Sequence, residues 1–258
     1  MSRRSRALSG ALAALIVLAG AGRARAQGGP FVEAMAELSP VQIGGYQSTW
    51  RVGRIGAGVQ RDGRFGWNAG VERHQRGGLV DWAGQAGGFQ RLGNWTWSGS
   101  AGYADAPGFL YHRSLEGQLS RRVIGGLVVG GGYRHLEFPA TTVRIVEPSA
   151  SFYFARGEIG AQGFLVRNDS SAQRSSVALL RSAVDLSRHV TVTGGAAIGA
   201  RIFDVDTFGR GAHDAWQAFG SLRVRAGARL SMELMAGGAH EDPLFTQQTI
   251  ATRVRWSF

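Results

Sequence analysis

Apolar and polar residues alternate with a period of two through this chain to its last residue, and this pattern most restricts how the chain can fold. The final nine residues show it clearly. One face carries Ile250, Thr252, Val254, Trp256 and Phe258, and the other carries Ala251, Arg253, Arg255 and Ser257. Helical periodicity is almost absent, and residues 27–258 hold no apolar stretch long enough for a transmembrane helix. The chain is therefore a β-sandwich in water or, in a membrane, a closed β-barrel, because only closure leaves no unpaired strand edge in lipid.

The first 26 residues have the features of a secretory signal peptide. A basic segment over residues 1–6 precedes an apolar segment over residues 7–21, and the A-x-A cleavage site Ala24-Arg25-Ala26 follows. We expect cleavage between Ala26 and Gln27, which leaves residues 27–258 as one exported domain.

Composition excludes several classes of function. The chain has no Cys, which removes disulfides, thiolate catalysis and Cys-based metal sites. Its 29 basic residues are all Arg, and five of them lie in the signal segment, so the mature chain has 24 Arg against 18 acids, a net charge of +6. An exported protein with this moderate charge and no basic run is not expected to bind nucleic acid.

The polar faces of the predicted strands favour a membrane barrel over a sandwich. Arg223, Arg225 and Glu233 fall on the face opposite the apolar one, where a sealed soluble core would leave them desolvated and a wet lumen would not. Aromatic residues near strand ends are typical of the interfacial girdles of outer-membrane barrels. These residues are Trp95, Tyr103, Trp216 and Trp256. We predict an all-β, up-and-down antiparallel transmembrane barrel.

Turn signals divide the chain into strand pairs. Tight turns containing Arg or Gly recur every 30 to 39 residues, and longer connections lie between them, which is the periplasmic and external asymmetry of outer-membrane barrels. The predicted strands span 31–38, 48–60, 64–75, 79–91, 95–104, 111–121, 125–137, 142–154, 157–167, 175–186, 189–203, 215–226, 229–240 and 246–258. This makes 14 strands, with 12 as the alternative, since bacterial barrels have an even number and strand 31–38 has the weakest pattern.

Residues 94–165 resemble the YaiO family of outer-membrane β-barrel proteins. The matching runs are Gly102–Asp105, Phe109–Arg113, Leu115-Glu116, Gly131–Phe138 and Val143–Val146. The chain departs from the family pattern in having Ala106-Pro107-Gly108 before Phe109, where the family has Pro after the Phe. The resemblance implies an outer-membrane location, a barrel, and a link to envelope or exported polysaccharide, and it carries over no catalytic residues.

One short motif has the residue types of a lipid hydrolase. His112 and Ser114 form a His-x-Ser pair with Glu116 two residues further on, and outer-membrane lipid hydrolases use such a pair to activate the Ser hydroxyl. In those enzymes the pair faces lipid, whereas alternation here places these three residues on the polar face. A solvated lumen stripe is the favoured interpretation, and a lipid-modifying hydrolase is the alternative.

Alternation also gathers charges inside the barrel, with Arg in excess over acid. The cluster is Arg134, Arg181, Arg201, Arg223, Arg225, Glu233, Arg253 and Arg255, with Arg54, Arg64, Glu72, Glu147, Glu158 and Asp185 on the same face. Rings of Arg bias a pore toward anions. The alternative is a ladder of ion pairs across the lumen that plugs and braces a structural barrel.

The predicted function is a passive outer-membrane pore, or a barrel that supports export, for anionic or saccharide-like solutes. Val254, Trp256 and Phe258 are typical of the C-terminal signal for the outer-membrane assembly machinery. Further expected partners are outer-membrane lipid, lipopolysaccharide and an envelope polysaccharide. No cofactor or metal site is predicted, because the six His form neither an H-x3-H nor an H-E-x-x-H set.

Overall fold

The computed structural model describes residues 28–61, 63–169, 174–201, 213–241 and 245–258, without the side chains of residues 200, 201 and 213. The expected signal segment and its cleavage at Ala26–Gln27 lie outside this part of the chain. Among the described residues, no helix is long and apolar enough to cross a membrane.

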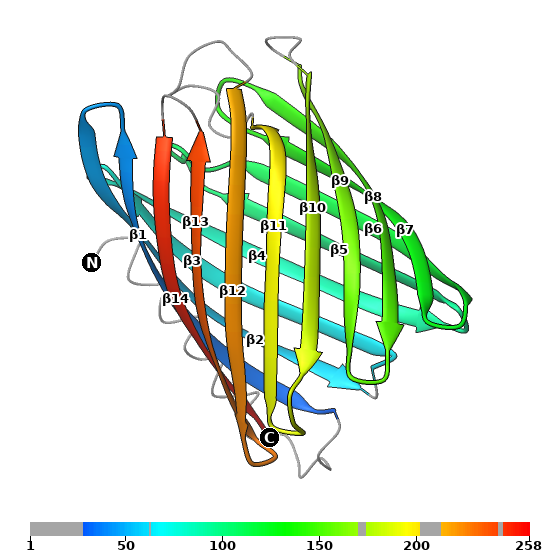
Figure 1. The fold of residues 1–258 in the computed structure, drawn as a ribbon. Coiled ribbons are helices and arrows are strands. Elements are labelled where there is room, and N and C mark those ends of the chain that lie inside the picture. Colours follow the sequence, from blue (N-terminus) through cyan, green and yellow to red (C-terminus); the bar gives the residue numbers. More distant parts are fainter. Residues whose placement is uncertain (1–27, 62, 170–173, 202–212, 242–244) are drawn as a thin grey trace.

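The described chain forms one closed antiparallel barrel of 14 strands, as predicted (Figure 1). The strands are β1 (Pro30–Ile43), β2 (Tyr46–Arg61), β3 (Phe65–Arg76), β4 (Leu79–Leu92), β5 (Trp95–Ala104), β6 (Arg113–Ile124), β7 (Leu127–Glu137), β8 (Thr142–Phe154), β9 (Gly157–Asn168), β10 (Arg174–Asp185), β11 (Val190–Arg201), β12 (His213–Ala226), β13 (Leu230–Glu241) and β14 (Phe245–Ser257). Each strand pairs with its neighbours in sequence, and β1 pairs with β14 to close the sheet, for example Val32 opposite Trp256. The alternative of 12 strands is wrong.

The first strand is longer than predicted. It runs from Pro30 to Ile43 and pairs with β2 along its whole length, whereas the pattern predicted an end at residue 38. Pro40 lies within the added segment, and proline cannot donate a ladder hydrogen bond. In the structure the pairing with β14 is interrupted at Ser39 and Pro40, so the strand continues past a local gap in one ladder.

The two ends of the barrel differ. The chain enters and leaves at one end, where the backbone N–H of Phe258 donates to the carbonyl of Pro30 at 3.0 Å. Turns at that end are short. Gly93, for example, takes a φ of 59° in the two-residue turn between β4 and β5, a left-handed conformation that suits glycine. The opposite end has longer connections, including residues 105–112 and 138–141, although the connection between β3 and β4 at this end is only a two-residue turn, Gly77-Gly78.

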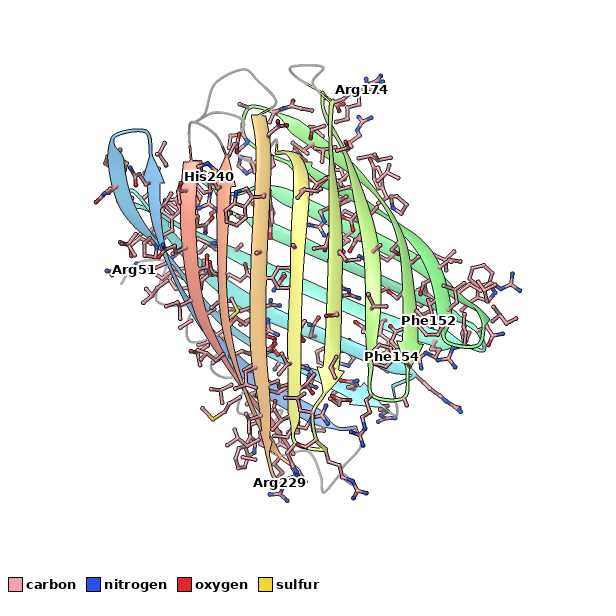
Figure 2. The ribbon with its side chains drawn as sticks, viewed as in Figure 1. Arg51, Phe152, Phe154, Arg174, Arg229 and His240 are labelled. Carbon is pink, nitrogen blue, oxygen red and sulfur yellow. The ribbon has the colours of Figure 1, made fainter. Side chains whose placement is uncertain are left out.

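The outer face of the barrel is apolar, as the alternation predicted. Leu38, Ile55, Leu115, Leu180, Ile198, Leu234 and Ile250 are each more than half exposed. Most exposed aromatic residues lie toward the two ends of the strands, with Tyr133 of β7 between them. Near the chain termini they are Phe65, Trp67, Trp95, Trp97, Phe152, Phe154 and Trp256, and near the other end they are Tyr46, Trp82, Tyr103 and Trp216. Figure 2 shows Phe152 and Phe154 toward the end that holds Arg229, with Arg174 at the opposite end. An apolar belt between two aromatic girdles is the exterior of a barrel that spans lipid.

Two neighbouring residues of β10 test this assignment of faces. Leu180→Arg places a charge on the exposed apolar face in mid-strand, and we expect it to lower the free energy of unfolding by about 2–4 kcal/mol. Residue 179 faces the wet interior, so Leu179→Arg should lower the free energy of unfolding much less. Denaturant unfolding of the barrel in lipid vesicles measures both variants, and equal losses would contradict the assignment.

Candidate functional site

The candidate site is the lumen, where charged side chains of the inward faces form three groups of ion pairs. The predicted interior residues gather there with two exceptions. Arg64 lies in the turn between β2 and β3 and is exposed, because β2 ends at Arg61 and β3 begins only at Phe65. The side chain of Arg201 lies outside the described part of the chain.

The first group lies near the chain termini and is centred on Glu233 of β13. Its carboxylate accepts hydrogen bonds from Arg223 at 3.0 Å, Arg253 at 3.4 Å and the Ser221 hydroxyl at 2.9 Å. Strand register creates this group, because Glu233 is paired with Arg223 on β12 and with Arg253 on β14. Of the five charged residues that alternation places on these three successive strands, Arg223, Glu233 and Arg253 therefore cluster.

Arg225 and Arg255 lie outside this first group. The Arg255 guanidinium stacks on the ring of Phe31 at 3.5 Å and donates a hydrogen bond to the Gln60 side chain at 3.3 Å. Phe31 and Gln60 were not predicted as site residues, because β14, which carries Arg255, meets β1 only through barrel closure. Arg225 is exposed near the end of β12.

The second group is centred on Arg134 of β7. Its guanidinium lies 3.2 Å from the Glu116 carboxylate and 3.3 Å from that of Glu147. The Glu147 side chain is only 1% exposed and also accepts a hydrogen bond from Gln162 at 3.0 Å. A carboxylate this buried requires such partners.

The third group joins β2, β3 and β4. Glu72 lies 3.6 Å from Arg54 and 2.9 Å from His74, and it accepts a hydrogen bond from Gln85 at 2.8 Å. A separate pair, Arg181 with Glu158 at 3.4 Å, connects β10 and β9.

All these ion pairs run along the barrel wall. Each joins residues of one strand or of two hydrogen-bonded neighbours, as with Arg54 opposite Glu72 and Glu116 opposite Arg134. Within the described residues, the lumen ion pairs therefore do not form the cross-lumen ladder of the plugged-barrel alternative. Neighbouring strands lie about 5 Å apart, a distance that an Arg–Glu pair can span. The lumen of a 14-strand barrel is much wider, so a pair across it is less favourable.

The lumen is also less basic than the sequence suggested. Glu33, Glu37, Asp81 and Glu241 share the inward face, together with Arg76. Glu33, Asp81, Glu241 and Arg76 lie near strand ends, where the alternation is hardest to assign, whereas Glu37 lies in the middle of β1. Among the side chains that the structure describes, acids and bases inside the barrel are therefore close to balance.

The His-x-Ser motif does not form a nucleophile–base pair. His112 lies just before β6, which begins at Arg113, although its backbone N–H donates to the Glu137 carbonyl at 2.6 Å and its carbonyl accepts from the N–H of Ala104 at 3.0 Å. The Ser114 hydroxyl hydrogen-bonds Tyr111 instead, and Glu116 belongs to the Arg134 group. Burial raises the pKa of the Tyr111 phenol, which keeps it neutral.

A cavity of about 320 Å³ lies inside the barrel toward the end opposite the chain termini. Glu37, Trp50, Glu241 and Phe245 line one part of it, and Phe109, Leu110 and Tyr111 of the β5–β6 connection line another. A second cavity of about 320 Å³ lies toward the termini. Within the described residues, no group of three or more His, Asp or Glu side chains is placed to hold a metal ion.

Solved structures of outer-membrane barrels share this fold. A bacterial polysaccharide outer membrane secretin matches with a TM-score of 0.60 at 9% identity, over 88% of this chain and 98% of that one. The toluene transporter TodX of Pseudomonas putida matches with a TM-score of 0.58 at 9% identity, over 89% and 90%. These identities show the fold alone, which is that of an outer-membrane β-barrel. No family model and no curated protein matches the chain.

Loss of the Glu233 carboxylate should destabilise the barrel. Glu233→Gln leaves Arg223 and Arg253 facing each other, and we expect the free energy of unfolding to fall by about 1–2 kcal/mol, since both Arg side chains remain partly in water. The matched control is Glu137→Gln, which removes an exposed pair with Arg113 at 3.9 Å and should change little. The measurement is urea unfolding in vesicles, and an equal effect of the two variants would refute the assigned role of Glu233.

Proposed function

We propose that the chain is a passive pore of the bacterial outer membrane that conducts small polar solutes, saccharide-like ones included. The observation that carries the proposal is the placement of the ion pairs along the wall of a 14-strand barrel. Barrels of eight strands are filled by side chains and those of 16–18 strands enclose water, so 14 strands with wall-bound pairs favour a conducting lumen.

The proposed solute class rests on the lining and on the resemblance. A near balance of Arg and acid favours polar solutes without a strong preference for one charge. The expected anion selectivity is therefore weaker than the sequence alone predicted. Membership of the YaiO family, on residues 94–165, is part of the proposal, and a role beside an envelope polysaccharide comes with it. The proposal also includes removal of residues 1–26 on export, contact with lipopolysaccharide, and assembly through Val254, Trp256 and Phe258.

The end near the chain termini keeps a local excess of Arg, which should give a mild anion preference. Planar-bilayer recordings of the refolded barrel should show conductance steps, and Arg225→Gln should lower the anion-to-cation permeability ratio by about twofold. A unit charge about 10 Å from an ion in water changes the ion's energy by about 0.4 kcal/mol, with opposite sign for an anion and a cation. Screening by salt over about one Debye length reduces the resulting difference of about 0.8 kcal/mol to about 0.3–0.4 kcal/mol, which corresponds to that factor.

The matched control is Arg121→Gln, because the Arg121 guanidinium lies over the outer-face ring of Trp95 and should not affect the permeating ion. A folded barrel that shows no steps would overturn the pore. Lipid hydrolysis that is lost in both His112→Ala and Ser114→Ala would restore the hydrolase alternative.

A further inference from the structure

The connection between β5 and β6, residues 105–112, is folded into the barrel. Leu110 is 7% exposed and packs against Ala83 and Ala104, two inward-facing residues of the wall. Tyr111 reaches Ser114, which also faces the lumen. At the same end, the β1–β2 and β3–β4 connections are two-residue turns, so this connection differs from both in length and in direction.

Asp81 on β4 holds the connection in place. Its carboxylate accepts three backbone hydrogen bonds, from the N–H groups of Gly108, Phe109 and Leu110, each at 2.9 Å. Asp81 itself is 6% exposed. Three successive N–H groups folded inward need acceptors, and bonds to an ionised carboxylate are about twice as strong as neutral ones.

A second contact braces the same segment from another strand. The Arg76 guanidinium of β3 lies 4.2 Å from the ring centre of Trp50 and 4.9 Å from that of Phe109. Trp50 in turn contacts Phe245 of β14, with ring centres 5.9 Å apart. The segment is therefore tied to β2 and β3 as well as to β4, through side chains that lie inside the barrel.

This placement narrows the lumen. The cavity of about 320 Å³ has the segment on one side and residues of β1, β2, β13 and β14 on the other. We propose that residues 105–112 are the constriction that sets the size limit of the pore, and that Asp81 is the residue that holds them there. This inference rests on the proposed pore function and names its size-selecting element.

Single-channel recordings and polymer exclusion test the constriction. Asp81→Asn and Asp81→Ala should each give a larger conductance step and admit larger polyethylene glycols than the wild type, with the greater shift for Asp81→Ala. The matched control is Asp105→Asn, which changes an exposed acid of the same connection and should leave both readouts at the wild-type level. The heat-dependent gel mobility of each variant checks that the barrel has folded.

A reversible crosslink sharpens the test, because the chain has no Cys of its own. In the Asp81→Ala background, Ala83→Cys with Leu110→Cys would join two residues that pack together. Oxidation should return the conductance step to the wild-type level, and reduction should enlarge it again. If the Asp81 variants do not fold, Phe109→Ala with Leu110→Ala widens the same point with Asp81 intact and should also enlarge the step.

The outcomes separate this inference from the proposed function. If the wild type conducts and the Asp81 variants leave its conductance step unchanged, the proposed constriction is overturned and the proposed pore function stands. A silent wild type with a conducting Asp81→Ala supports the constriction as a full closure and overturns passive conduction. Silence of both folded proteins overturns both.

Discussion

The structure depends on one requirement, which is that every strand edge be paired where lipid surrounds the sheet. The pairing of β1 with β14 meets it by joining the first and last strands of the chain. An open edge would leave a row of N–H and C=O groups in hydrocarbon, at several kcal/mol for each group. Closure also divides every strand into an outer face for lipid and an inner face for water, so the same period of two that makes the strand also separates exterior from lumen.

Strand register then determines which lumen side chains meet. Glu233 lies between two arginines because it is paired with Arg223 on one side and with Arg253 on the other. Glu116 and Arg134 meet for the same reason. The ion pairs are thus a consequence of the backbone ladder, which places opposite charges on neighbouring strands at the same level and leaves the middle of the barrel to solvent.

Much of this could be predicted from the sequence, because the period of two and the turn residues are local signals. They predicted 14 strands and the shared outer face of Ile250, Val254 and Trp256. The predicted end of β1 was wrong because the local pattern of this strand is weak, whereas its pairing with β2 continues to Ile43. Arg64 was misplaced because a strand boundary moved by one residue changes a lumen position into a turn position.

The inward segment at residues 105–112 had no local signal. Its anchor is an Asp that precedes it by 27 to 29 residues and binds backbone N–H groups, which carry no sequence information. The inward acids near strand ends were missed for a related reason, since facing there depends on the register of the neighbours. A sequence pattern therefore does not predict contacts between a side chain and a distant backbone segment. It also does not predict the facing of residues at strand ends.

The confinement of the ion pairs to adjacent strands also affects how such a barrel can be built. In the three groups and in the Arg181–Glu158 pair, each charged side chain finds its partner on the same or an adjacent strand, so these pairs do not wait for the two ends of the chain to meet. A partly assembled sheet can therefore carry its polar residues already compensated while hairpins are added one after another. The final closure of β1 on β14 then completes backbone pairing and places Arg255 against Phe31, with the other groups already in place.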